Sequence, residues 1–197
     1  MTHYRQRSEG SGPGVLALIR EDLRRHWGDL TRPGFQALAI YRLRHRVHRD
    51  DAGPFAALAR LLLRPLGGIM RFRFGITIHP TAELGMRPSI RHQGGILVGP
   101  NVTLGDDCEI LQGVRIEPSR AHSGSGGSPT IGNRVLIGAR SQVCGEIRIG
   151  DDARIGPNAI ITVDVPAGAT AVARPSKVVR AQATPGIAPA EVGPACG

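Results

Sequence analysis

From residue 76 onward, the hydrophobic positions of the chain recur every six residues. The aliphatic residues on this spacing form three runs: Ile78, Leu84 and Ile90; then Val98, Leu104, Ile110 and Ile116; then Ile131, Ile137, Val143, Ile149, Ile155 and Ile161. A period of six matches neither the 3.6-residue turn of an α-helix nor the two-residue alternation of a strand. Hexapeptide repetition is typical of a parallel β-helix, in which each repeat supplies one flat face and a turn.

The composition supports this interpretation. Aromatic residues make up 4% of the chain, as expected for a narrow triangular prism with no room for rings. Seven of the 27 glycines directly follow a repeat aliphatic, where a corner needs backbone freedom. Three hexapeptides close one coil, so thirteen repeats predict about four coils. We therefore predict a mainly β fold with a parallel β-helix over residues 76–166.

Residues 15–75 have helical periodicity instead. A first helix places Val15, Leu16, Ile19 and Leu23 on one face and charged residues on the other. A second helical run resumes after a break at Pro33 and Gly34, and a third follows Pro54, which suits a first helical position. We expect this short α-helical segment to cover the first coil, because a one-dimensional stack needs its ends closed.

The remaining segments lack periodicity. The polar residues 1–14 and the tail, residues 181–197, are predicted to be disordered. Residues 167–180 are predicted to form a C-terminal extension that leaves the last coil.

The six-residue spacing is interrupted twice. Eight residues separate Ile90 from Val98, and His92 lies in this interruption. Fifteen residues separate Ile116 from Ile131, in a Gly/Ser-rich loop that contains Arg120 and His122. A solenoid accepts insertions at its corners, and such loops commonly carry function.

The coil length predicts where these interruptions lie in space. With three repeats to a coil, we expect His92 to lie beside Gln112 and both interruptions to lie at about one edge of the prism. A histidine there can act as a general base, because its ordinary pKa of about 6.5 leaves the neutral form well populated at neutral pH.

The charge of the chain is strongly positive, with a formal value of +9. All of its basic residues except Lys177 are arginines, and fourteen of these precede residue 75. Such a segment can attract nucleic acid, anionic lipid or an acidic small molecule. Because no nucleic-acid module signature accompanies the charge, we interpret it as solvated helix faces and predict no nucleic-acid partner.

The three cysteines are widely spaced, which favours free thiols in a reducing compartment. The N-terminus has no apolar core typical of a secretory signal, and the longest apolar stretch is interrupted by Arg and Pro. These features predict a cytoplasmic protein that does not enter a membrane.

Five segments carry a resemblance to a known family: "IHPTAELG", "RHQGGILVG", "DDCEILQGV", "VLIGARSQVCGEIRIGDDARIGPNAII" and "DVPAGATAVARPSKVV". Together, from about Ile76 to Val179, they resemble the serine acetyltransferase family of hexapeptide-repeat acyltransferases. The resemblance implies a left-handed β-helix that assembles as a homotrimer with active sites in grooves between neighbouring prisms. It also implies acetyl-CoA as co-substrate, no permanently bound cofactor, and a small-molecule acceptor with a hydroxyl group.

The resemblance assigns roles to individual residues. His92 matches the histidine that takes a proton from the acceptor hydroxyl, which then attacks the thioester carbonyl. Gln112 is expected to border the thioester. Gly138 and Ala139 match backbone that contacts the pantetheine arm, and Lys177 falls where a basic residue approaches the nucleotide end of CoA.

Four positions depart from the family pattern. Thr77 and Arg91 stand where the family commonly has Asp, and Gly127 and Ser128 stand where it has Arg and His. Arg91 replaces an acidic residue next to His92, so it is expected to repel an ammonium group and to favour an acceptor with a carboxylate or phosphate.

Arg91, Arg120 and His122 are therefore the candidates for binding the acceptor. The sequence leaves open an acceptor that is a sugar, a polysaccharide precursor or a carrier-linked group, and also a non-catalytic scaffold with the same fold. A metalloenzyme such as a γ-class carbonic anhydrase needs three converging histidines. The solenoid offers His79, His92 and His122 without an H-x₄-H pair, so no metal site is predicted.

Overall fold

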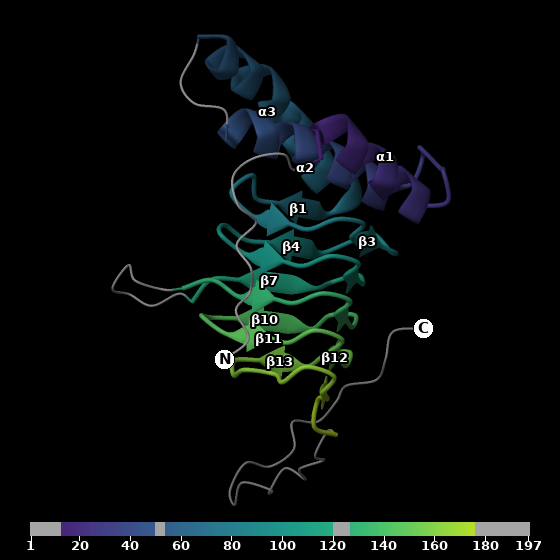
Figure 1. The fold of residues 1–197 in the computed structure, drawn as a ribbon, viewed down its shortest axis with the longest axis vertical. Helices are drawn as coiled ribbons and strands as arrows, with labels where there is room; N and C mark the ends of the chain where they lie inside the picture. The colour runs from purple at the N-terminus through teal and green to yellow at the C-terminus, as the bar shows by residue number, and fades with distance from the viewer. Residues whose placement is uncertain (1–12, 50–53, 120–126, 176–197) are drawn as a thin grey trace, which may run out of the picture.

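A computed structural model describes residues 13–49, 54–119 and 127–175 of the chain (Figure 1). The described residues include three helices, α1 (Val15–Arg25), α2 (Pro33–Arg49) and α3 (Pro54–Phe74). Figure 1 shows these helices covering one end of a column of short parallel strands. The predicted fold class, a mainly β parallel β-helix that follows an α-helical segment, is confirmed.

In the described part of the chain, the strands form three parallel sheets, which we name face A, face B and face C. Face A contains β1 (Ile76–Ile78), β4 (Ile96–Val98), β7 (Arg115–Glu117), β10 (Gln142–Cys144) and β13 (Ile160–Ile161). Face B contains β2 (Glu83–Leu84), β5 (Thr103–Leu104), β8 (Thr130–Ile131) and β11 (Arg148–Ile149). Face C contains β3 (Ser89–Ile90), β6 (Glu109–Ile110), β9 (Leu136–Ile137), β12 (Arg154–Ile155) and β14 (Thr170–Ala171).

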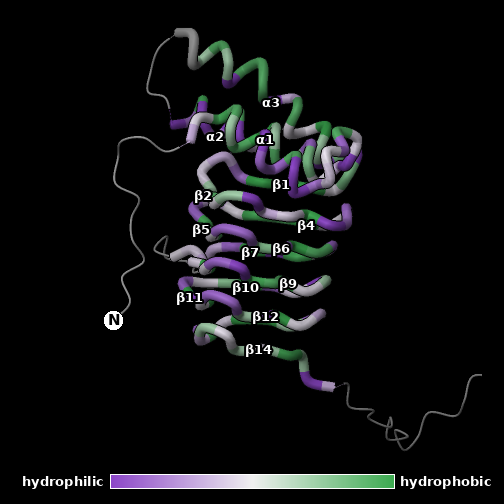
Figure 2. Tube along the Cα trace, turned by 45° about the vertical axis from the view of Figure 1, so that its right-hand side comes forward, coloured by the Kyte–Doolittle hydropathy of each residue, from purple (hydrophilic) through white to green (hydrophobic). Residues whose placement is uncertain are grey.

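The chain runs from face A to face B to face C in each coil, and the repeat aliphatics stack inside the prism. On face C, Ile90 pairs with Ile110, which pairs with Ile137 in the next coil. On face A, Val98 pairs with Ile116. These side chains are buried, and Figure 2 shows hydrophobic positions recurring in each coil of the solenoid. The six-residue period therefore has a direct cause, since one inward aliphatic is needed for each face.

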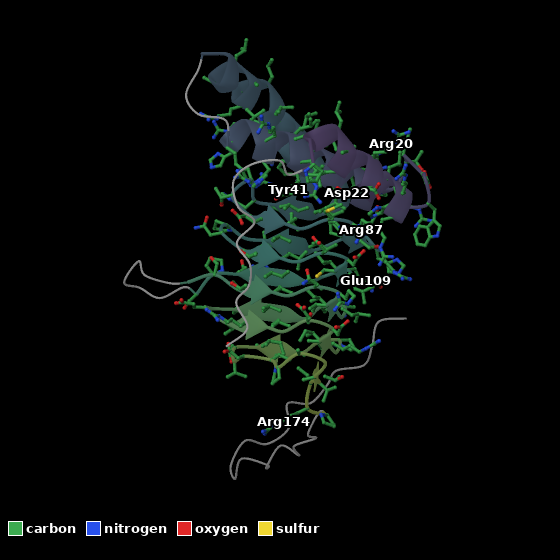
Figure 3. The ribbon with its side chains drawn as sticks, viewed as in Figure 1. Arg20, Asp22, Tyr41, Arg87, Glu109 and Arg174 are labelled. Atoms are coloured by element: carbon green, nitrogen blue, oxygen red, sulfur yellow. The ribbon has the colours of Figure 1, made fainter. Side chains whose placement is uncertain are left out.

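The helices are fixed to the first coil by a buried polar cluster. The guanidinium of Arg42 donates from Nε to Oδ2 of Asp22 at 2.9 Å and from Nη1 and Nη2 to the carbonyl oxygens of Leu84 and Gly85, at 2.7 and 2.6 Å. The Tyr41 hydroxyl donates to the carbonyl of Ala82 at 2.6 Å. Asp22 and Tyr41 lie at the junction of the helices and the first coil (Figure 3).

The ion pair in this cluster is nearly inaccessible to solvent, since Asp22 is 0% and Arg42 3% exposed. Burial raises the pKa of the Asp22 carboxyl, and the hydrogen bond from Arg42 opposes this rise. Because each charge has lost its water, each depends on the other for compensation. The pair therefore joins α1 to α2, and the two Arg42 bonds to carbonyls join both helices to the solenoid.

Two further contacts, one from the end of α1 and one from the start of α2, set the helical segment against β3. His26 donates from Nδ1 to the carbonyl of Asp22 at 2.7 Å, and its Nε2 faces the N–H of Ile90 at 3.4 Å. At Gly34, a Cβ atom would lie 2.3 Å from the carbonyl oxygen of Ile90, so a side chain has no space there. The first turn of α2 therefore packs directly against the end of β3, where the first interruption begins.

We predict that Arg42→Met lowers the free energy of unfolding by about 3–5 kcal/mol, because it leaves the Asp22 carboxylate buried without its cation. The measurement is urea denaturation at one protein concentration. Arg134→Met is the matched control, because Arg134 and Asp152 form an ion pair with side chains 56% and 55% exposed. Such a pair contributes about 0–1 kcal/mol. Equal effects of the two substitutions would show that the buried pair does not hold the helices.

Candidate active site

The first interruption is a two-residue bulge at the corner between face C and face A. Before it, the N–H of Arg91 donates to the carbonyl of Ile110, and the N–H of Leu111 donates to the carbonyl of Ile137 in the same way. Arg91 and Leu111 therefore occupy equivalent places in successive coils. The ladder of main-chain hydrogen bonds between successive coils, which we call the inter-coil ladder, is regular up to this point.

After the bulge, the ladder resumes with a shifted register. The N–H of Gly113 donates to the carbonyl of Gly94, as the N–H of Arg140 donates to the carbonyl of Gln112 one coil later. Gln112 therefore stacks on Gly94, and the expectation that it lies directly beside His92 is wrong. Arg91 matches Leu111 and Gly94 matches Gln112, and Leu111 and Gln112 are consecutive. The two residues between Arg91 and Gly94, His92 and Gln93, therefore lie outside the ladder.

The bulge exposes His92 beside a cavity of about 360 Å³. The corner contributes Ile90, Arg91, His92 and Gln93 to its lining, and the helical segment contributes Arg32, Pro33 and Gly34. Among the described residues, no group forms a hydrogen bond with the imidazole of His92. Arg32 was not among the residues predicted for the site, although the break at Pro33 and Gly34 marked the turn that carries it.

Arg91 is paired with a carboxylate. Its Nε lies 2.7 Å from Oε1 of Glu109, a residue of β6 that Figure 3 shows on the side of the solenoid below α1. The Arg91 side chain is 48% exposed and the Glu109 side chain 17% exposed. The charge that Arg91 brings to the site is therefore partly balanced, which the sequence did not indicate.

Three of the residues expected to bind CoA, Gln112, Gly138 and Ala139, lie in the coils after the bulge. Oε1 of Gln112 is buried and has no hydrogen-bond partner among the described residues. The N–H of Gly138 donates to the carbonyl of Ile155, and its carbonyl accepts from the N–H and hydroxyl of Ser141. The carbonyl of Ala139 accepts from Asn158, whereas its N–H has no main-chain partner in the described part of the chain. Gln112 Oε1 and the Ala139 N–H thus have no hydrogen-bond partner in the described part of the chain.

The second interruption leaves the prism at a different corner, between face A and face B. It follows β7 and returns at β8, and the N–H of Ser119 donates to the carbonyl of Gly127 across its base at 3.2 Å. Face A lies between this corner and the bulge, so the expectation that both interruptions share one edge is wrong within a single chain. Arg120 and His122 lie outside the described residues, as does Lys177.

A smaller hollow of about 200 Å³ lies at this second corner, with Thr77, His79 and Glu117 in its lining. Nδ1 of His79 accepts a hydrogen bond from the Thr81 hydroxyl at 2.7 Å, and burial lowers the pKa of this imidazole. His79 and His92 are at different corners of the prism. The described residues contain no group of three His, Cys, Asp or Glu side chains that could hold a metal ion.

Two of the positions that depart from the family pattern, Ser128 and Thr77, make contacts within the solenoid. The Ser128 hydroxyl donates to the carbonyl of Pro100 at 3.0 Å. Thr77 pairs with Leu97 between β1 and β4.

In the parts of the chain that the structure describes, no helix is long and apolar enough to span a membrane.

Comparisons with known proteins agree with this architecture. Residues 128–162 match the family model described as bacterial transferase hexapeptide (six repeats). A serine acetyltransferase from Helicobacter pylori is 40% identical over 147 residues, which cover 75% of this chain and 81% of that protein.

Solved structures show the same similarity. Serine acetyltransferase from Neisseria gonorrhoeae is 31% identical with a TM-score of 0.69, and the match covers 87% of this chain and 68% of that one. Soybean serine acetyltransferase complexed with serine is 28% identical with a TM-score of 0.71, over 85% of this chain and 70% of that one. The chain therefore belongs to the serine acetyltransferase family of hexapeptide-repeat proteins, and it is an acyltransferase that uses an acyl-CoA donor.

We predict that Gln112→Leu raises the midpoint of thermal unfolding in the absence of CoA. A buried oxygen without a partner costs about 1–3 kcal/mol, which an apolar side chain of similar size avoids. Gln142→Leu is the control, because Gln142 is exposed on face A and its replacement should change stability by less than about 0.5 kcal/mol. A lower midpoint for Gln112→Leu than for the control would show that the Gln112 amide is satisfied within the protein.

Proposed function

We propose that this protein transfers the acetyl group of acetyl-CoA to a hydroxyl of a small acceptor, with His92 as the general base. The observation that carries this proposal is the bulge. It removes His92 from the inter-coil ladder and leaves the imidazole exposed beside a cavity large enough for a small molecule. The names of the relatives support acetyl transfer to serine or to a related acceptor.

The proposed reaction begins when neutral His92 accepts the proton of the acceptor hydroxyl. The acceptor oxygen attacks the thioester carbonyl, and a tetrahedral intermediate forms. The attack forms the new carbon–oxygen bond. Collapse of the intermediate restores the carbonyl and breaks the carbon–sulfur bond, and the departing thiolate takes the proton from the imidazolium. General base catalysis of this kind contributes about 10²- to 10⁴-fold. Positioning of the two substrates and stabilisation of the oxyanion contribute the rest.

In this proposal, Gln112 and Ala139 hold the donor. The pantetheine arm of CoA contains amide groups, whose carbonyl oxygens can accept from the N–H of Ala139. Their N–H groups can donate to Oε1 of Gln112 when the Gln112 side chain turns toward the groove. Gly138 stays a candidate for contact with the pantetheine arm, and its lack of a side chain also lets the next coil pack closely, since a Cβ there would lie 2.6 Å from the carbonyl oxygen of Ile155. Lys177 remains the candidate for the nucleotide end of CoA.

A homotrimer would bring the two interruptions together. Within one chain, face A separates the bulge at His92 from the corner that carries the 120–126 loop. In a threefold assembly with grooves between neighbouring prisms, that loop of one subunit can lie beside the bulge of the next. Arg120 and His122 would then contact the acceptor from the neighbouring subunit. The separation of the two corners supports an active site shared between subunits.

We predict that His92→Ala lowers kcat for acetyl transfer by about 10²- to 10⁴-fold, because the acceptor hydroxyl loses its base. The measurement is release of free CoA thiol from acetyl-CoA, with L-serine and with small sugars as acceptors. His48→Ala is the control, because His48 is an exposed histidine of α2 that does not line the cavity.

The folded state of both variants is checked by their thermal unfolding midpoints. Unchanged turnover in His92→Ala would refute its assignment as the base. If the unmodified protein also fails to bind CoA at millimolar concentration, the fold serves here as a non-catalytic scaffold.

A further inference from the structure

The wall of the cavity that faces the helical segment is formed around Arg32. This residue ends the turn between α1 and α2, which positive φ angles at Trp27 (59°) and Gly28 (73°) allow. The Arg32 guanidinium carbon lies 4.3 Å from the centre of the Trp27 ring. Its Nε lies 3.5 Å from Oδ2 of Asp29. The side chain is therefore held from two sides.

Asp29 is itself fixed. Its Oδ1 accepts hydrogen bonds from the N–H of Thr31 at 2.8 Å and from the Thr31 hydroxyl at 2.6 Å. These bonds lower the pKa of the Asp29 carboxyl, so the group is ionised at neutral pH. Trp27 and Asp29 both contact the Arg32 side chain, and its buried Nε has no hydrogen-bond partner among the described residues. Contacts of this kind reduce the conformational freedom that the side chain loses when the guanidinium binds a ligand.

The turn is also fixed relative to His92. Gly34 packs against Ile90, and the buried pair of Asp22 and Arg42 joins α1 and α2 to the first coil. Arg32 and His92 thus line one cavity from two separate parts of the fold. A polar atom of a ligand at Arg32 and a hydroxyl at His92 can belong to the same small molecule.

The lining of this cavity is positively charged. It contains Arg32 and Arg91, and among the described residues no Asp or Glu belongs to it. The carboxylates that pair with these arginines, Asp29 and Glu109, lie outside the lining. Guanidinium groups form short, charge-assisted hydrogen bonds with carboxylate and phosphate oxygens. The cavity therefore suits an anionic ligand better than a cationic one, because its lining holds two arginines and no carboxylate among the described residues.

We propose that Arg32 is a specificity-determining residue that binds an oxyanion of the acceptor, whose hydroxyl faces His92. The acceptor class is a small hydroxylated carboxylate or phosphate monoester, in which an amino group contributes little to binding. This inference rests on the proposed acetyl transfer and adds to it the chemistry of the acceptor. It also gives the helical segment a part in substrate selection.

The test compares four acceptors at saturating acetyl-CoA: L-serine, L-serinamide, L-glycerate and glycerol 3-phosphate. Serinamide removes the carboxylate, glycerate removes the ammonium, and the phosphate ester distinguishes the two oxyanions. The unmodified protein should use glycerate at least as well as serine. Its kcat/KM for serinamide should be about 10- to 100-fold lower than its kcat/KM for serine, the range that a charged hydrogen bond gives.

Arg32→Gln should raise KM for the preferred anionic acceptor by about 10- to 100-fold and leave KM for acetyl-CoA and for serinamide unchanged. Arg32→Lys should restore part of the preference, since it keeps the charge and loses the planar fork. Arg24→Gln is the matched control, because Arg24 is an exposed arginine of α1 that pairs with Glu21 and does not line the cavity. An unchanged ratio of serine to serinamide in Arg32→Gln would overturn the proposal.

A binding measurement separates this inference from the proposed function. If none of the acceptors is acetylated, the proposed reaction is wrong. Calorimetric titration of the protein with glycerate and with glycerol 3-phosphate then decides the role of Arg32. Binding to the unmodified protein that is lost in Arg32→Gln, with equal thermal midpoints, supports an oxyanion site. Equal affinity of both proteins, or binding to neither, would overturn it.

Discussion

The stacking of inward aliphatic side chains in successive coils is the constraint on which the whole structure depends. Coils approach so closely that a Cβ at Gly105 would lie 2.5 Å from the carbonyl oxygen of Gly132. An extra residue within a face would move every later aliphatic out of register with the coil beneath it. Insertions are therefore confined to the corners, and the two-residue bulge at His92 is such an insertion. The exposed position of the imidazole follows from the packing rule that governs the rest of the prism.

The helical segment adds a second function to its role of closing the solenoid. The Asp22–Arg42 pair is nearly without solvent contact, and replacement of such pairs by apolar residues is often neutral or stabilising. Its value here lies in orientation, because Arg42 also donates to two carbonyls of the first coil. With the helices held in one place, the turn that ends at Arg32 becomes a wall of the cavity beside His92. Substrate selection and the stability of the first coil are thus linked through the same contacts.

Much of the fold could be predicted from the sequence because hexapeptide periodicity reports directly on inward-facing positions. The pairing of Ile90 with Ile110 and of Val98 with Ile116 follows from counting alone. The site was less accessible to such reasoning. The count placed Gln112 beside His92, but a bulge shifts the register after it, and Gln112 stacks on Gly94. The ion pair of Arg91 with Glu109 and the approach of Arg32 depend on side-chain direction and on helix docking, which periodicity does not encode.

The most direct test of this account is a crystal structure of the protein with CoA bound. The account predicts that the thiol of CoA lies at the corner between faces C and A, within reach of the His92 imidazole. It also predicts that the pantetheine arm passes Gln112 and Ala139, with an amide N–H directed at Gln112 Oε1. A CoA thiol bound at the corner of faces A and B near His79 of the same chain, with no CoA thiol within reach of His92, would contradict this prediction.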